Sequence, residues 1–214
     1  MFEYTPNNFN GHVLRTILSI AYSFALRSGD YVITGLQTTH RTLKFKNIYT
    51  FSNNNRLYIQ LTLIYGKSNR YHKTEILTTE CTCNIYNINL CPYHNFVKLK
   101  SLYISYNLYE TSNTYLFMWK NKKVVNYYTL SKLYYALIEK TGRTVNLRYK
   151  LHGLRFGRIT DLRASGCPAW LIEKLARHAP GSVMTYYYTR MSSTEEAQFI
   201  QKYLIKYNKK HSKN

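Results

Sequence analysis

Apolar residues recur at helical spacing in several parts of the chain. Residues 12–26 carry them on one stripe, which predicts an amphipathic helix near the N-terminus. A second stripe spans 130–138 and is followed by a Lys-Thr-Gly sequence, which is typical of a helix C-terminus. Further along, Pro168 can occupy the first turn of a short helix over 169–177, and 195–207 predicts a last helix.

A different pattern spans 57–65, where apolar and polar residues alternate. Alternation indicates a β-strand with one buried face. A Gly-Lys-Ser-Asn turn interrupts the pattern, which resumes at 74–77, so we predict a β-hairpin with Lys67 at its tip. Helices towards both ends and a sheet between them predict a mixed α/β (α+β) fold, mainly helical, with a small antiparallel sheet on one side.

The chain is strongly basic, which narrows the class of partner. Thirty Lys and Arg residues against ten Asp and Glu residues give a formal net charge of +20 on 214 residues. This excess favours a polyanionic partner, with nucleic acid first and an anionic membrane surface as the alternative. No run approaches the ~18 apolar residues of a membrane span, and the N-terminus lacks a signal-peptide pattern. We expect an intracellular protein of one domain that is not membrane-associated.

The four cysteines raise the question of a metal. Cys81, Cys83 and Cys91 can be combined with His94 into a four-ligand set, but the spacing is not that of a common zinc module. We therefore expect reduced, structural cysteines, and we predict neither a metal site nor a cofactor. Cys167 stands alone in the sequence and is interpreted as a packing residue.

The densest group of reactive side chains lies within 151–190, where two histidines and an arginine precede three consecutive tyrosines. These are the groups that phosphodiester transfer through a tyrosine requires. A phenol with a pKa near ~10 attacks phosphorus poorly unless a base accepts its proton and the phosphate charge is neutralised. Arginine forks bond two phosphate oxygens and stay charged, and a lysine with a lowered pKa can protonate the leaving oxygen.

The order of these groups resembles the second half of the catalytic domain of tyrosine recombinases, the phage integrase family. The His-Gly-Leu-Arg sequence at 152–155 resembles the family's His-x-x-Arg box, and Gly166 and His178 follow at the family's intervals. The resemblance implies that Arg155 grips the scissile phosphate, that His152 assists proton transfer and that His178 donates to the phosphate. It also implies the DNA breaking-rejoining catalytic-domain fold and metal-independent strand transfer through a 3′-phosphotyrosine.

The attacking tyrosine is one of three neighbours. A Gly-Ser-x-Met sequence before them resembles archaeal-type integrases and selects Tyr188 as the nucleophile. The interval common in bacterial integrases selects Tyr187, which is the second choice. Tyr186 is interpreted as a core ring.

The first half of the chain resembles the family more loosely. Arg27 follows a hydrophobic helix and precedes an acid, Asp30, as in the family's Gly-Leu-Arg-x-x-Glu pattern, and it is the expected first catalytic arginine. A rival alignment places Gln37 at that position, which implies an impaired enzyme, and Arg41 is a third alternative.

Two further assignments in this half rest on the same resemblance. Lys67 resembles the family's hairpin lysine, which protonates the leaving oxygen, and Lys73 is the neighbouring alternative. Residues 115–117 resemble a structural strand of the family.

The resemblance organises the chain into an N-terminal extension (1–11), a catalytic domain (12–207) and a basic tail (208–214). It implies double-stranded DNA as partner, further protomers in a tetrameric synapse on DNA, and a location with DNA in the cytoplasm, the nucleoid or a host nucleus. It is consistent with a gene carried by a virus or plasmid. The alternatives are an impaired recombinase-fold DNA-binding protein and a basic RNA-binding protein whose tyrosines stack on bases.

Overall fold

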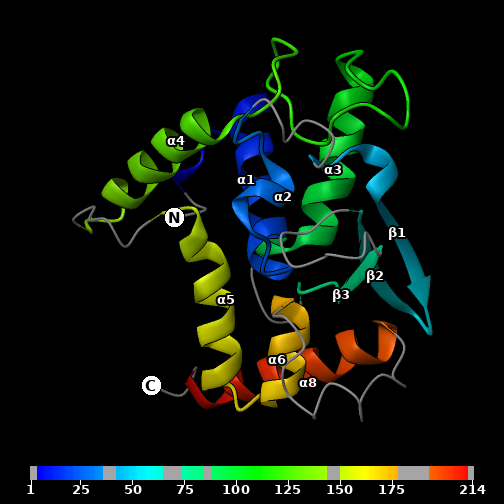
Figure 1. Ribbon diagram of the computed structural model, residues 1–214, viewed down its shortest axis with the longest axis vertical. Coiled ribbons are helices and arrows are strands. Elements are labelled where there is room, and N and C mark those ends of the chain that lie inside the picture. The colour runs from blue at the N-terminus through cyan, green and yellow to red at the C-terminus, as the bar shows by residue number, and fades with distance from the viewer. Residues whose placement is uncertain are drawn as a thin grey trace.

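The computed structural model describes residues 4–35, 42–64, 74–83, 88–143, 150–177 and 193–211. Helices predominate in this part of the chain, and three strands form one sheet. In chain order the elements are α1 (Phe9–Ser23), α2 (Ser28–Tyr31), the 3-10 helix η3 (Phe45–Asn47), β1 (Ile48–Asn53), β2 (Arg56–Leu63), β3 (Glu75–Glu80), the 3-10 helix η4 (Ile88–Leu90), α3 (Pro92–Ser105), α4 (Tyr127–Lys140), α5 (His152–Ala164), α6 (Ala169–Ala176) and α8 (Ser193–His211) (Figure 1).

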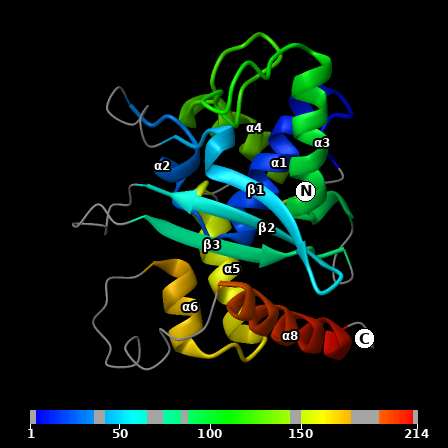
Figure 2. The ribbon, with the colours of Figure 1, turned by 90° about the vertical axis from the view of Figure 1, so that its right-hand side faces the viewer.

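The sheet is antiparallel with the strand order β1-β2-β3. A two-residue turn joins β1 to β2, since Asn53 pairs with Arg56, and both turn residues, Asn54 and Asn55, have positive φ. This geometry is that of a type I′ hairpin, in which asparagine tolerates the left-handed conformation. Helices lie on both sides of the sheet, with α1 and α3 on one side and α6 and α8 on the other (Figure 2).

The two faces of the central strand β2 explain this sandwich. Ile59, Leu61 and Leu63 point to the side of α1 and α3 and belong to the main hydrophobic core. Tyr58 lies on the opposite face, where its hydroxyl accepts a hydrogen bond of 2.8 Å from the Gln198 amide of α8. Because β2 is buried on both faces over most of its length, the sheet holds α8 and the main core together.

The hydrophobic residues form two clusters. The main core surrounds α1, whose apolar positions are buried on nearly all sides, and includes residues of α3, α4 and the sheet. A second, smaller cluster joins α5, α6 and α8. Helix α5 spans both, because Leu154 in its first turn packs in the main core whereas Ile159 and Leu162 pack in the second cluster. The chain leaving α1 also reaches both clusters, through Leu26 and Ala25.

Most elements expected from the sequence are confirmed. The stripe at 12–26 lies largely in α1, that at 130–138 in α4, that at 195–207 in α8, and 57–65 pairs with 74–77 as β2 and β3. Helix α6 confirms the short helix after Pro168. The mainly helical α+β prediction is therefore correct, although β1, α3 and α5 were not anticipated. The tip of the hairpin, with Lys67, lies outside the described residues.

The expectation of a strand at 115–117 is wrong. The segment makes only isolated bridges, between Tyr115 and Lys44 and, just beyond it, between Met118 and Val124. Single backbone hydrogen bonds hold the segment, from the N–H of Leu116 to the carbonyl of Leu43 and from the N–H of Val125 to the carbonyl of Phe117. At Met118 the hydroxyl of Tyr103 bonds both the N–H and the carbonyl. Among the helices of the described residues, none combines the length and the apolar character that crossing a membrane requires.

Candidate anion-binding site

Three segments far apart in the sequence meet where the two hydrophobic clusters adjoin. They are the chain leaving α1, the first turn of α5 and the end of α6, and each contributes one arginine: Arg27, Arg155 and Arg177. The fold brings these together because Ala25 and Ala176 are buried in the second cluster and Leu154 in the adjoining main core. The candidate site is built around this group of guanidiniums.

Arg155 is the most constrained of the three. Its side chain is buried, with 3% of the residue exposed, and lies on the first turn of α5. Nη1 donates a hydrogen bond of 2.7 Å to the carbonyl of Ala25, and Nη2 donates to the carbonyl of Ala176 at the end of α6. Arg155 therefore ties α5 to the end of α1 and to the end of α6.

Arg27 and Asp30 form the next part of the site. Arg27 is the N-cap residue of α2, and its backbone N–H donates to the Asp30 carboxylate at 2.8 Å. Its guanidinium Nη2 donates to the carbonyl of Arg177 at 3.1 Å. Nη1 of Arg27 is buried and has no hydrogen-bond partner among the described residues. One guanidinium donor of Arg27 is thus available for a group that the described residues do not supply.

Arg177 was not anticipated as a site residue. It caps α6 in the left-handed conformation, with φ 51, and this turn directs its buried side chain towards α2. Its Nη2 donates to the Asp30 carboxylate at 2.7 Å, and its Nε lies 4.0 Å from the carboxylate of Glu75 in β3. Asp30 therefore bridges the backbone of Arg27 and the guanidinium of Arg177.

Positive charge exceeds negative charge in this group. Burial, followed by the charges of Arg27 and Arg177, lowers the pKa of Arg155 to about 10. Burial and the charge of Arg177 likewise lower the pKa of Arg27, whereas Asp30 opposes the shift. Like charges held together in a partly desolvated place favour an anion, and planar guanidiniums suit the oxygens of a phosphate.

His152 lies at the rim of this group, one helical turn before Arg155 and on the same face of α5. Partial desolvation, followed by the positive charges of Arg155 and Arg27, lowers the pKa of His152 from its ordinary value of 6.5. The imidazole is therefore neutral at pH 7 and has a lone pair with which it can accept a proton.

The structure thus brings together Arg27, His152 and Arg155, which the sequence singled out. It adds Arg177 and Asp30, and the capping relation between Arg27 and an acid three positions later was a signal for Asp30. The remaining predicted site residues and their alternatives lie outside the described residues: Gln37, Arg41, Lys67, Lys73, His178, Tyr186, Tyr187 and Tyr188.

The comparisons with known proteins concern the fold. No protein-family model matches the chain, and no curated protein sequence matches it either. Among solved structures, the chain is similar to the XerH site-specific recombinase bound to its difH substrate in a pre-cleavage complex, with a TM-score of 0.58 and 18% sequence identity. The similarity covers 92% of this chain and 47% of that one, so this chain spans about half the length of its neighbour. The fold is that of a tyrosine recombinase catalytic domain.

Proposed function

We propose that this protein is a tyrosine-type DNA strand transferase, a site-specific recombinase or integrase that cuts and rejoins DNA through a 3′-phosphotyrosine intermediate. The observation that carries the proposal is the convergence of Arg27, His152 and Arg155 within the tyrosine recombinase catalytic-domain fold. The site unites segments 130 positions apart around an excess of positive charge. A neutral imidazole beside guanidinium forks suits attack on a phosphodiester.

In the proposed first step, the phenol oxygen of Tyr188 attacks the scissile phosphorus and the bond to the 5′-oxygen breaks. The phenol proton passes to His152, and the leaving 5′-oxygen takes a proton from Lys67. Arg27 and Arg155 neutralise the charge that develops on the non-bridging oxygens, as a metal ion does in other phosphoryl transferases. Rejoining reverses the step, with a 5′-hydroxyl attacking the phosphotyrosine. Tyr187 is the alternative nucleophile.

Double-stranded DNA is the proposed partner. The net charge of +20 favours phosphate contacts, and the neighbouring structure is a DNA-bound recombinase complex. We assign catalysis to residues 12–207, with 1–11 as an extension and 208–214 as a basic tail. Several protomers assemble on DNA in this proposal, as a tetrameric synapse.

A second candidate has support from one observation. The two terminal nitrogens of Arg155 both donate to backbone carbonyls. A guanidinium used in this way can be purely structural, which would make the protein a catalytically impaired, DNA-binding member of the fold. The RNA-binding alternative is less favoured, because an arginine that serves only to contact RNA would lie on the surface, whereas Arg155 is buried in the group of guanidiniums.

The decisive experiment traps the covalent intermediate. Nicked duplexes drawn from the flanks of the encoding element are incubated with the protein in the presence of EDTA, and the products are separated under denaturing conditions. A protein–DNA adduct that maps to the peptide with Tyr186 to Tyr188 supports the strand transferase, and its loss in Tyr188→Phe but not in Tyr187→Phe identifies the nucleophile. Salt-sensitive binding of the same DNA without an adduct favours the impaired form.

A further inference from the structure

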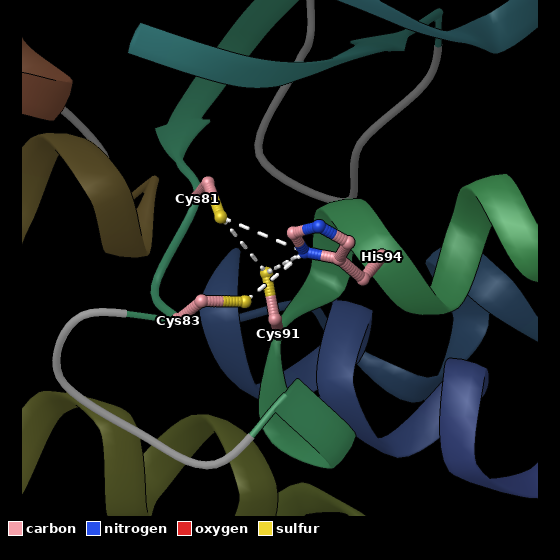
Figure 3. A group of neighbouring side chains, drawn as sticks. All are labelled: Cys81, Cys83, Cys91 and His94. Atoms are coloured by element: carbon pink, nitrogen blue, oxygen red, sulfur yellow. Dashed lines mark hydrogen bonds between the residues drawn. The ribbon is translucent and has the colours of Figure 1, made fainter.

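Four potential metal ligands lie together at a place remote from the guanidiniums. Cys81 and Cys83 follow the end of β3, Cys91 is the N-cap residue of α3, and His94 is in the first turn of that helix. Figure 3 shows the three sulfurs and the imidazole directed towards a common centre. The four ligand atoms all lie within 4.8 Å of one another.

Four of the six separations between these atoms are close to those expected around one tetrahedral ion. Bonds of about 2.3 Å from zinc to sulfur and about 2.0–2.1 Å to nitrogen place two sulfurs about 3.8 Å apart and a sulfur about 3.6 Å from a nitrogen. Cys81 Sγ lies 3.5 Å from Cys91 Sγ, and Nδ1 of His94 lies 3.6, 3.0 and 3.4 Å from the sulfurs of Cys81, Cys83 and Cys91.

A disulfide does not account for the cluster. A bond between two sulfurs requires a separation of about 2.0 Å, whereas the sulfurs of Cys81 and Cys91 are 3.5 Å apart. All three cysteines are free thiols in this structure. The hydrogen bonds among the three thiols and the imidazole are weak, because a thiol is a weak donor and its sulfur a weak acceptor, so they do not by themselves account for the grouping.

We propose that Cys81, Cys83, Cys91 and His94 bind one zinc ion as a structural site. Thiolate and imidazole donors in a tetrahedral arrangement are the preferred surroundings of zinc. Four protein ligands leave no open position for a substrate, so the site is structural. Coordination would displace the thiol protons, so binding weakens as the pH falls.

The local structure explains why the spacing obscured this site. Cys91 and His94 lie on one face because they are three positions apart in the first turn of a helix. Cys81 and Cys83 have a single residue between them, which is unusual for zinc modules, but in the segment that follows β3 both sulfurs point to the same centre (Figure 3). The expectation of reduced, structural cysteines without a metal rested on spacing alone.

The ligands are held by neighbouring elements, which gives the ion a structural task. The backbone N–H of Cys81 donates to Leu57 of β2 at 2.7 Å, and its carbonyl accepts from the Gln201 amide of α8 at 3.2 Å. The Asn95 amide donates to the carbonyl of Cys91 at 2.9 Å. A bound ion would therefore link the end of β3 to the N-terminus of α3, beside the Cys81 carbonyl that accepts a hydrogen bond from α8.

The test measures the metal content of the purified, reduced protein, produced without a metal-affinity tag. We expect one zinc per chain by elemental analysis. Cys83→Ser removes a half-buried ligand and should lower zinc retention against a competing chelator by more than about tenfold. Cys167→Ser is the matched control, because this buried cysteine packs in the second cluster and should keep zinc at the wild-type level.

Cobalt substitution provides a readout that does not depend on the variants folding. Co²⁺ bound to the wild-type protein should give the thiolate charge-transfer band and the intense visible bands of tetrahedral coordination. The proposal is overturned by absence of zinc together with absence of the cobalt bands. It is also overturned by equal zinc loss in Cys83→Ser and Cys167→Ser. A Cys81–Cys91 disulfide found by mass spectrometry of the native protein would also overturn it. None of these outcomes bears on strand transfer, so the two proposals are tested separately.

Discussion

Arg155 takes part both in the local fold and in the charge of the site. Its donors hold the carbonyls of Ala25 and Ala176, and its positive charge lowers the pKa of His152. In a complex with DNA, a phosphate would compete with these carbonyls for the same nitrogens. Substitution of Arg155 therefore separates a catalytic role from a structural one only if cleavage and binding are both measured.

Arg155→Lys keeps the positive charge and removes the fork. We expect single-turnover cleavage of nicked DNA to fall by about 100-fold or more, because charge stabilisation in the transition state depends on placed donors, while DNA affinity changes much less. Arg163→Lys, at an exposed position later in α5, should leave both quantities unchanged. Equal losses of cleavage and binding in Arg155→Lys would show that the residue is structural.

Asp30 is the acidic partner that the buried Arg177 requires. Asp30→Asn removes the closer of the two negative charges beside the buried guanidinium and leaves it the longer contact with Glu75, which should lower the free energy of unfolding by about 3–5 kcal/mol. Urea denaturation measures this loss. The control is Glu110→Gln, which breaks an exposed pair with Lys122 and should cost at most about 1 kcal/mol. Similar losses of unfolding free energy in the two variants would mean that the buried ion pair stabilises the protein no more than the exposed one.

Residue spacing could reveal some members of the site and not others. His152 and Arg155 share one helix turn, so their relation is visible in the sequence, and Arg27 precedes an acid at the distance of a helix cap. The pairing of Arg177 with Asp30 joins residues 147 positions apart. Such a contact leaves no local pattern in the sequence, because it forms only when α6 packs against the end of α1.

The same limit applies to whole elements. Helix α3 was missed although its buried residues include Phe96, Leu99 and Tyr103 at helical spacing, because Val97 and Ile104 are exposed and blur the stripe. Helix α5 has the opposite difficulty. Its inner face includes the buried Arg155 and Arg158 together with Leu154, Ile159 and Leu162, so an apolar stripe is interrupted by charged residues. Charged residues on an inner face hide a helix from a hydrophobicity pattern.

The β1–β2 hairpin offers a test of turn chemistry. Asn55 has φ 58 at the second position of a two-residue type I′ turn, where glycine adopts positive φ without steric cost. Asn55→Gly should therefore raise the free energy of unfolding by up to about 1 kcal/mol. The steric cost of positive φ for asparagine exceeds the additional backbone entropy that glycine loses on folding. Thermal unfolding measures the change. Asn53→Gly, in the adjoining strand, should destabilise instead.

Helix α1 carries a buried histidine that makes stability depend on pH. Burial lowers the pKa of His12 below 6.5, with smaller contributions of the same sign from Lys98 and Arg15 and an opposing hydrogen bond to the carbonyl of Asn95. Between the folded and unfolded pKa values the unfolded chain binds more protons, so the free energy of unfolding should fall as the pH drops below about 6.5.

Replacing His12 tests this pH dependence of the free energy of unfolding. His12→Gln should flatten the fall in unfolding free energy between pH 6.5 and the folded pKa, as measured by urea denaturation at several pH values. His152 has a pKa shifted in the same direction, so His152→Gln should also reduce the slope, and the double variant should flatten it further. An unchanged slope in His12→Gln would mean that this ring is not held neutral by the fold.

At the scale of the whole molecule, the sheet connects the two proposed sites. The candidate anion site touches β3 through Glu75, and the proposed zinc site begins just beyond the other end of the same strand, at Cys81. Helix α8 spans the sheet face between α6 and the Cys81 carbonyl. Removal of zinc with a chelator should therefore loosen α8 before it affects the main core, and hydrogen exchange can resolve the order of these events.

The net charge of +20 predicts that the proposed DNA binding depends on salt. Each phosphate contact releases counterions and adds about 0.9 to the slope of log K against log salt, so three contacts contribute about 2.7. Changing Lys209, Lys210 and Lys213 in the basic tail to Gln should lower the slope by up to this amount if these lysines contact DNA phosphates. Fluorescence anisotropy with a labelled duplex measures the slope. Lys122→Gln, at an exposed lysine already paired with Glu110, is the control and should leave the slope unchanged. An unaltered slope in the triple variant would place the phosphate contacts elsewhere on the molecule.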